Sequence, residues 1–248
     1  MTELVHFGLT DGVATITLDS PHNRNALSRQ LVTELFEALD RAEAEDDARV
    51  VLIRSAERVF CSGADLSEAA GGGMEEGTRA LVELQCRLVT HSRPVVTRLA
   101  GPVRAGGLGI VAASDIVVCS DDVTFAFTES RLALAPAVIS LTVVPRLTSR
   151  AAAETFLTGR TFEAIEAEEM GLVTRAVPSE ELDDVVTEIC SELKKAHPQG
   201  LRETKALLAR DLVARIDAQA DDMAALSARL FGSDQAREAM TAFLNRKK

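Results

Sequence analysis

Tryptophan and tyrosine are absent from the chain, and nine phenylalanines bring the aromatic content to only 4%. An interior built from these residues has to be mostly aliphatic. Proteins that bind single-stranded nucleic acid stack bases on aromatic rings, and this composition argues against such a platform. A formal net charge of −11 also disfavours binding to nucleic acid or to an anionic membrane surface. An anionic small ligand would therefore need a local basic cluster.

Cysteines are few, and they lie too far apart in the sequence to form a CxxC pair. This spacing favours free thiols in a reducing cytoplasm over a disulfide framework or a zinc site. Long apolar runs are also missing, because no stretch approaches the roughly 18 residues of a transmembrane helix. The N-terminal MTELVHFGL has no basic segment followed by an apolar block. We therefore expect a cytoplasmic protein with no signal peptide, no membrane span and no metal ion.

The composition that remains is that of a globular protein, with 248 residues of which 46% are hydrophobic. Strand-like and helix-like patterns alternate through residues 1–195, which predicts an α/β fold, and the chain from 196 to 248 is patterned as helix. Asp11-Gly12 predicts a hairpin turn between strands at 4–9 and 13–18. Further strands are predicted at 50–53, 59–61, 95–99, 116–119, 123–127 and 173–177, the first of these buried on both faces of a parallel sheet.

Two helix starts and one loop are predicted in the first third of the chain. Ser28 is expected to cap a helix that ends near Asp46, and Thr78 is expected to cap the next helix. Gly71 to Gly73, followed by acidic residues, predict a mobile stretch before it. The second helix is expected to carry Leu81, Leu84, Gln85 and Leu88.

Two stretches of small residues each follow a run of apolar, β-favouring residues. The first is Val59-Phe60-Cys61-Ser62-Gly63-Ala64-Asp65-Leu66, and the second runs from Gly101 to Gly109 with the sequence GPVRAGGLG. Small residues allow the backbone to approach a ligand and to point its N–H groups outward. Two N–H groups that converge on one oxygen form an oxyanion hole. We hypothesise that Ala64 and Gly106 supply these two donors, although tight turns packed near a sheet would show the same composition.

The second stretch also contains a dinucleotide-binding pattern, because residues 107–112 fit G-x-G-x-x-A after a strand. The helix predicted over 108–113 is too short for a βαβ crossover of about 30 residues. The glycines also lie several residues beyond the strand rather than at its end. The sequence therefore argues against a dinucleotide site.

The sequence resembles the crotonase family, also called the enoyl-CoA hydratase/isomerase family. The matching segments occur in the order and spacing of the family and span most of the chain. They are SPHNRNALS at 20–28, FCSGADL at 60–66, RPVVTRLAGPVRAGGLGIVAASDI at 93–116, FTESRLALAPAVIS at 127–140 and LTGRTFEAIEAEEMGLV at 157–173.

The resemblance implies an α/β spiral of β-β-α units at 1–195, which would carry an acyl-CoA site, and a helical trimerisation region at 196–248. A homotrimer, or a hexamer formed by two such trimers, is the expected assembly. The substrate would be a coenzyme A thioester, with no separate cofactor. The family's two oxyanion donors match Ala64 and Gly106, the pair that the composition of the two loops suggests.

The resemblance also identifies one catalytic carboxylate. Two-glutamate hydratases of the family have one glutamate after the second glycine loop, where this chain has Gly109, and another 20 positions later, at Glu129. An apolar acyl pocket should raise the pKa of Glu129, which suits proton transfer at the substrate α-carbon. Three functions remain open: an enoyl-CoA hydratase, a Δ3,Δ2-enoyl-CoA isomerase that shuttles a proton with one glutamate, and a CoA-thioester-binding protein with little activity.

The remaining candidates concern the coenzyme A end of the substrate. The resemblance points to Arg24 and Ala26, then Ser62, Asp65 and Leu66, with Gly107 and Gly109 beside them, although Arg24 on a polar loop could equally be solvated. In relatives a C-terminal Phe/Lys pair of a neighbouring subunit reaches the nucleotide. Phe231 or Phe243 could play that part here, beside the basic residues 246–248, unless this basic tip is disordered.

Two arginines and two histidines have no clear role in the sequence. Arg98, in a predicted strand, or Arg104, in the loop after it, is expected to pair with Asp115 or to line the acyl pocket. His22 and His91 are predicted in loops without a partner at metal-ligand spacing.

Overall fold

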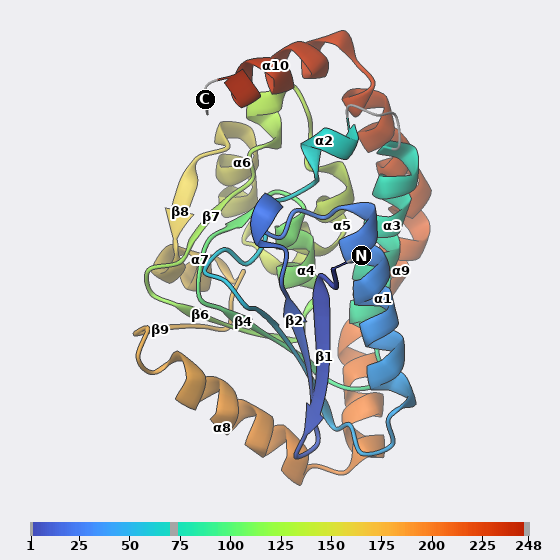
Figure 1. The fold of residues 1–248 in the computed structure, drawn as a ribbon, viewed down its shortest axis with the longest axis vertical. Coiled ribbons are helices and arrows are strands. Elements are labelled where there is room, and N and C mark those ends of the chain that lie inside the picture. The colour runs from blue at the N-terminus through green and yellow to red at the C-terminus, as the bar shows by residue number, and fades with distance from the viewer. Residues whose placement is uncertain (1, 70–73, 246–248) are drawn as a thin grey trace.

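The computed structural model describes residues 2–69 and 74–245, and its centre is a six-stranded sheet (Figure 1). The first strand is antiparallel to its neighbour, and the other five are parallel. Asp11 and Gly12 both have positive φ angles, 48° and 74°, and join the first two strands as the predicted hairpin. In spatial order the strands are β1 (Val5–Thr10), β2 (Val13–Leu18), β3 (Val50–Ser55), β4 (Val95–Leu99), β6 (Ile116–Ser120) and β9 (Arg175–Val177).

The main sheet is covered on both faces, as the apolar run at 50–53 predicts. Val50 packs with Leu182 and Val186 of α8 (Leu182–Lys195) on one face. Val51 and Ile53 point to the opposite face and belong to the large core. That core is closed by helices that follow the strands as crossovers, which is the arrangement that buries a parallel sheet. These helices include α1 (Arg29–Ala44), α3 (Met74–Thr90), α4 (Gly107–Ala113) and α5 (Ala137–Arg146).

A second, smaller sheet lies beside the first and is made of β5 (Val103–Arg104), β7 (Thr124–Ala126) and β8 (Thr161–Glu163). β8 lies between α6 (Ser149–Thr158) and α7 (Ala164–Met170), in a region where the sequence predicts only helix. Three residues are too few to show a period of two. β8 is held instead by pairing with β7, where Phe125 stacks on Phe162 with ring centroids 5.6 Å apart.

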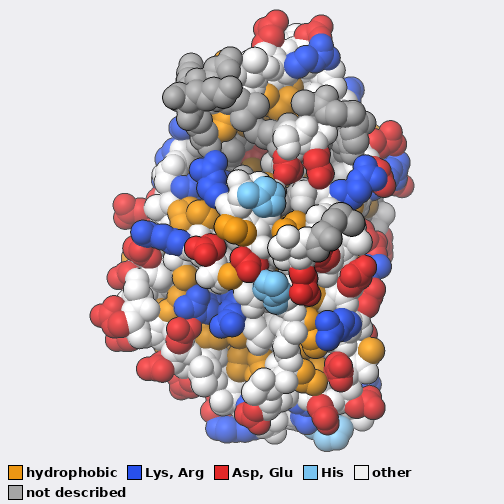
Figure 2. Space-filling model, viewed as in Figure 1, with side chains coloured by type: hydrophobic (Ala, Val, Ile, Leu, Met, Phe, Trp, Pro, Cys, Tyr) orange, Lys and Arg blue, Asp and Glu red, His pale blue; other side chains and the backbone are white. Residues whose placement is uncertain are grey.

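The C-terminal part of the described chain is helical, as predicted after Pro198. The long helix α9 (Pro198–Phe231) packs along α3 and α5, and α10 (Asp234–Asn245) lies beside the 3₁₀ turn η2 (Glu129–Leu132) (Figure 1). The division of the chain at 195/196 stays a prediction. Within the described residues no helix is long and apolar enough to cross a membrane. Acidic and basic side chains are interspersed over the face that Figure 2 shows.

The two predicted helix starts have different outcomes. Ser28 caps α1, because its Oγ accepts a hydrogen bond from the Leu31 N–H at 3.3 Å. The prediction for Thr78 is wrong, since α3 begins at Met74 and the Thr78 Oγ1 donates to the carbonyl of Glu75 within the helix. Acidic residues in the first turn stabilise a helix N-terminus, and here they belong to α3 rather than to a preceding loop. The stretch at 71–73 lies outside the described residues.

Candidate functional site

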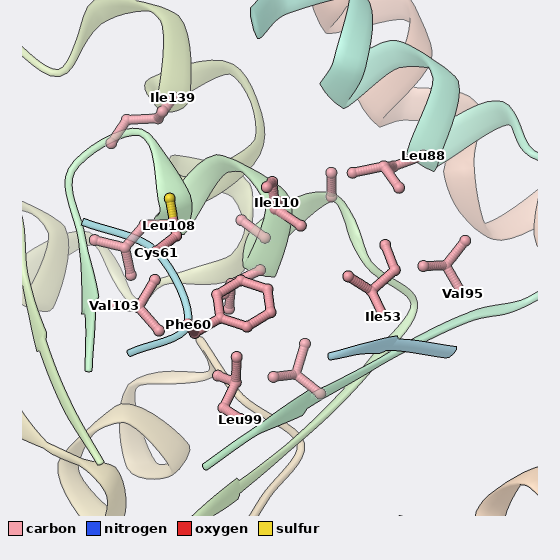
Figure 3. Packing of buried hydrophobic residues seen from close by; sticks show 14 of the residues in the cluster. Ile53, Phe60, Cys61, Leu88, Val95, Leu99, Val103, Leu108, Ile110 and Ile139 are labelled. Atoms are coloured by element: carbon pink, nitrogen blue, oxygen red, sulfur yellow. The ribbon is translucent and has the colours of Figure 1, made fainter. Parts of the chain in front are cut away.

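The two loops of small residues lie side by side, although about 40 residues separate them in the sequence. Cys61 forms an isolated parallel bridge with Val103, and its carbonyl accepts a hydrogen bond from the Arg104 N–H at 2.9 Å. One residue earlier, the Phe60 N–H donates to the carbonyl of Pro102. In Figure 3, the labelled side chains of Phe60, Cys61 and Val103 lie close together. The predicted strand at 59–61 is therefore only this single bridge.

The closeness of the two loops explains why they are built from small residues. Gly63 has φ +97°, and a Cβ there would lie 2.9 Å from the Cβ of Ala105. A Cβ at Gly107 would lie 2.7 Å from the Cβ of Cys61. Contacts this short do not occur between real carbon atoms, so a larger residue at either position would force the loops apart.

The N–H groups of Ala64 and Gly106 lie near one another where the loops meet. A Cβ built on Gly106 would lie 3.7 Å from the Ala64 nitrogen, and one built on Gly63 would lie 3.6 Å from the Gly106 nitrogen. Neither N–H has a hydrogen-bond acceptor among residues 2–69 and 74–245. Because backbone N–H groups in a folded interior are nearly always paired, two neighbouring unpaired donors can hold an oxygen of a ligand.

Glu129 is connected to these loops through the second sheet. The Ala105 N–H donates to the Ala126 carbonyl at 3.1 Å, and the chain then leaves β7 and enters η2 at Glu129. The Glu129 Oε2 is buried and has no hydrogen-bond partner within residues 2–69 and 74–245, although Glu129 as a whole is half-buried. Burial raises the pKa of this carboxyl to about 7. A carboxyl in this environment can gain or lose a proton near neutral pH.

The position one helical turn beyond Gly106 is filled from another helix. Gly109 is buried, and a Cβ there would lie 3.0 Å from the Ile139 Cγ2 and 3.2 Å from the Gln85 Cδ. Gln85 is fully buried, accepts a hydrogen bond from the Thr142 Oγ1 at 2.6 Å and donates to a backbone carbonyl of its own helix. The space beside Gly109 therefore holds a neutral amide. In the sequence, the signal for this arrangement is a single amide, Gln85, among the leucines of α3.

The coenzyme A candidates divide into two groups. Arg24 is exposed, at the end of the 3₁₀ turn η1 (Pro21–Asn23), while Ala26 is buried. Ser62 and Asp65 are hydrogen-bonded to the loop that contains these residues, through the Asn23 carbonyl and the Asn23 Nδ2 respectively. The structure thus brings four of the candidates together at one edge of the two loops. Leu66 begins the short helix α2 (Leu66–Ala69) directly after Asp65.

Asp65 is an ionised carboxylate rather than a proton donor. Burial alone would raise its pKa, but the hydrogen bonds from Ser67 and Asn23 outweigh burial and lower the pKa below its ordinary value. Its Oδ1 accepts from both the N–H and the Oγ of Ser67, which fixes the start of α2.

The predicted pairing of Arg98 or Arg104 with Asp115 is wrong. Arg98 donates to the Asp183 carboxylate on α8, at 2.6 Å, because its strand position faces that helix. Arg104 donates to the carbonyl and Oγ1 of Thr124 in the second sheet. Asp115 pairs with Lys205 of α9 at 2.8 Å, a contact between residues 90 positions apart that no local pattern signals.

The remaining residues named from the sequence are two histidines, two C-terminal phenylalanines and the basic residues 246–248. His22 contacts the Ser20 Oγ, and His91 is buried beside Glu43. No cluster of three or more His, Cys, Asp or Glu suited to a metal ion occurs in the described part of the chain. Phe231 ends α9, Phe243 lies on α10, and residues 246–248 lie outside the described residues, so their contact with a neighbouring subunit stays a prediction.

The chain has an α/β fold with two sheets and C-terminal helices, in which two N–H donors without an acceptor among the described residues lie near one another. The family model described as "Enoyl-CoA hydratase/isomerase" matches residues 8–248, and the chain belongs to this enoyl-CoA hydratase/isomerase, or crotonase, family. The crystal structure of an enoyl-CoA hydratase from Mycobacterium avium is 42% identical with a TM-score of 0.92, covering 99% of this chain and 98% of the other. The predicted family and crotonase fold are confirmed.

Relatives of similar identity have different reactions in their names. A 4-chlorobenzoyl coenzyme A dehalogenase from Arthrobacter is 36% identical over 77% of this chain and 73% of its own length. A peroxisomal Delta(3,5)-Delta(2,4)-dienoyl-CoA isomerase from Arabidopsis thaliana is 28% identical over 99% of this chain and 95% of its own length. The names share a coenzyme A thioester, while the step carried out on it varies.

Proposed function

We propose that this protein is an enoyl-CoA hydratase that adds water across the double bond of a 2-enoyl-CoA. The thioester oxygen would lie between the N–H groups of Ala64 and Gly106. Negative charge develops on this oxygen when a nucleophile adds to Cβ, and preorganised N–H donors stabilise that charge. Losing one such donor costs about 3–4 kcal/mol of transition-state stabilisation in enzymes where it has been measured.

The observation that carries the proposal is the buried Oε2 of Glu129, which has no hydrogen-bond partner among the described residues and belongs to a carboxyl with a pKa of about 7. In its protonated form Glu129 would deliver its proton to the α-carbon of the enolate. The hydroxyl of water forms the bond to Cβ, and the proton that this water releases returns to Glu129. The carbon–carbon double bond becomes a single bond, and the carboxyl ends the cycle as it began.

The substrate would be held by the two loops and by the segment at 20–28. We propose that Arg24, Ala26, Ser62, Asp65 and Leu66 lie along the coenzyme A arm, with Gly107 and Gly109 beneath the acyl group. The exposed Arg24 guanidinium is available to a phosphate of the coenzyme.

Replacing Glu129 tests the proposal directly. The Glu129→Gln variant keeps the shape of the side chain but cannot transfer a proton, and we expect kcat for crotonyl-CoA to fall by about 10³-fold. The loss of enone absorbance measures the rate. Glu180→Gln on the exposed surface is the matched control and should retain full activity. An unchanged rate in Glu129→Gln would sink the proposed role.

A Δ3,Δ2-enoyl-CoA isomerase is the second candidate, favoured by the neutral Gln85 amide beside Gly109, which leaves Glu129 as the buried acid of the site. An isomerase begins with the carboxylate form, which removes a proton from C2 and returns it at C4. Its kcat/KM should rise with pH through about 7, whereas hydration needs the protonated form and its kcat/KM should fall. Tight binding of coenzyme A thioesters with neither activity would instead indicate a binding protein.

We also propose that the chain assembles as a homotrimer or hexamer through residues 196–248. Leu207 and Leu208 on α9 are 61% and 79% exposed, and such side chains are usually covered by a partner when they cluster. Light scattering of the purified protein measures the assembly, and a monomer would contradict it. The four unpaired thiols support a cytoplasmic location.

A further inference from the structure

A buried asparagine connects the segment at 20–28 to the loop that carries Ala64. Asn25 is 1% exposed and has a left-handed backbone, with φ +52°. Its Oδ1 accepts a hydrogen bond from the Ser20 N–H at 2.6 Å, and its Nδ2 donates to the Val59 carbonyl at 2.9 Å. Asn25 therefore closes its own loop and holds the first residue of the neighbouring one.

The backbone continues this connection from Val59 toward Ala64. The Ser62 N–H donates to the Arg24 carbonyl at 3.1 Å, and the Leu27 N–H donates to the Gly63 carbonyl at 2.8 Å. The residues directly before Ala64 are thus fixed by the residues on either side of Asn25. The Ala64 N–H takes no part in these bonds.

We propose that Asn25 is a positioning residue that sets the direction of the Ala64 N–H without touching the substrate. The inference rests on the proposed thioester site and extends it to a side chain that the sequence did not single out. Only a short polar side chain fits both roles, since asparagine tolerates the left-handed region and offers one acceptor and one donor. An aspartate would place a second acceptor against the Val59 carbonyl.

The main test uses the Asn25→Asp variant and a substrate analogue that cannot be hydrated. Infrared spectra of butyryl-CoA with a ¹³C-labelled thioester carbonyl report how strongly the oxygen is hydrogen-bonded in the site. Binding to the wild-type protein should lower the carbonyl frequency, and Asn25→Asp should lose more than half of this shift. For crotonyl-CoA, kcat should fall about 10–100-fold while KM changes less than about threefold, because a donor misplaced by less than 1 Å affects the transition state most.

The pH dependence separates positioning from general loss of structure. Protonation turns the new carboxyl of Asn25→Asp into a donor toward the Val59 carbonyl, so the carbonyl shift relative to wild type should recover as the pH is lowered toward 5. Asn25→Gly keeps the left-handed backbone but removes both side-chain bonds, and its shift should stay reduced at every pH. Lys205→Met, which removes a buried lysine and its ion pair elsewhere, should melt earlier yet keep the full shift.

The outcomes distinguish the two proposals. Equal carbonyl shifts in wild type, Asn25→Asp and Asn25→Gly would overturn the role of Asn25. A full wild-type shift without turnover of crotonyl-CoA would overturn the proposed hydratase and leave the positioning role standing. A wild-type protein that binds butyryl-CoA without any shift would overturn both.

Discussion

Two carboxylates in this molecule, Glu129 and Asp115, lie in opposite settings. Asp115 is partly exposed and accepts hydrogen bonds from the Val95 N–H at 2.7 Å and from the Lys205 Nζ at 2.8 Å, and the lysine side chain is only 6% exposed. Among the described residues the buried Oε2 of Glu129 has no hydrogen-bond partner, and burial raises the pKa of this carboxyl. A paired charge holds elements together, whereas an unpaired acid is available for proton transfer. The same functional group therefore has a structural role at Asp115 and a proposed chemical role at Glu129.

The paired carboxylate should matter most for stability. Lys205 also donates to the carbonyls of Leu88 and Arg93, so it ties α9 to the end of α3 and to the start of β4. Lys205→Met removes the cation beside the partly exposed Asp115 and leaves the carbonyls of Leu88 and Arg93 without their donor. At about 1–3 kcal/mol for each unsatisfied carbonyl, we expect the free energy of unfolding to fall by about 4 kcal/mol.

Denaturant titration measures this loss, and the activity per folded molecule should not change. Lys195→Met removes an exposed lysine from a surface pair and is the control, with little expected effect. Equal midpoints for the two variants would contradict a structural role for the Lys205–Asp115 pair.

The unpaired carboxylate should lower stability, by a smaller amount and only at high pH. The pKa of Glu129 is about 7 in the folded protein and near 4.5 in the unfolded chain, so between these values the folded state binds the extra proton. Stability contributed by the neutral form is complete below pH 4.5 and is lost as the pH rises through 7. Glu129→Gln should therefore stabilise the protein by about 3 kcal/mol at pH 8 and by little at pH 4.5.

Unfolding curves of wild type and Glu129→Gln at the two pH values provide the measurement. A gain that is equal at pH 4.5 and pH 8 would show that ionisation of Glu129 is not its cause. Combined with the expected loss of activity, a gain confined to high pH would show that the site sacrifices stability for an accessible proton.

The smallest effect concerns the glycine that faces Gln85. In an open helix position Gly→Ala stabilises by up to about 1 kcal/mol, and a Cβ added at Gly77 on α3 would meet nothing within 4 Å. At Gly109 the Cβ would press on Ile139 and Gln85, and the cost of overpacking, about 1–3 kcal/mol, should exceed that gain. We expect Gly77→Ala to raise the melting temperature and Gly109→Ala to lower it. If both variants raise it, the core beside Gly109 is looser than its contacts indicate.

Local sequence patterns predicted the parts of the fold that depend on neighbours in the chain. The Asp11-Gly12 turn and the Ser28 cap are confirmed because a turn or a cap is decided within a few residues. The two loops of small residues were recognised because close backbone approach restricts the residue types. The choice of Glu129 came from the family resemblance, since a lone glutamate after a strand has no signature of its own.

Local patterns did not predict the contacts between residues that are far apart in the sequence. β8 exists because β7 pairs with it, and Asp115 is neutralised by a lysine of the last third of the chain rather than by Arg98 or Arg104. In the sequence Asn25 is one of several turn-forming residues, and only the structure places the Val59 carbonyl beside its amide. Likewise, the sequence shows Gln85 only as a polar residue among the leucines of a helix, and its hydrogen bond with Thr142 is seen only in the structure.

By itself the sequence determined the α/β class, the two loops of small residues and the family, because these depend on residue types at short spacings. Only the tertiary structure decided that the Ala64 and Gly106 N–H groups lie near one another and that Gln85 fills the space beside Gly109. It also decided that, within the described part of the chain, these two N–H groups and the buried Oε2 of Glu129 have no hydrogen-bond partner. Burial and pairing depend on which distant segments pack together, and the pKa of a carboxyl follows from both.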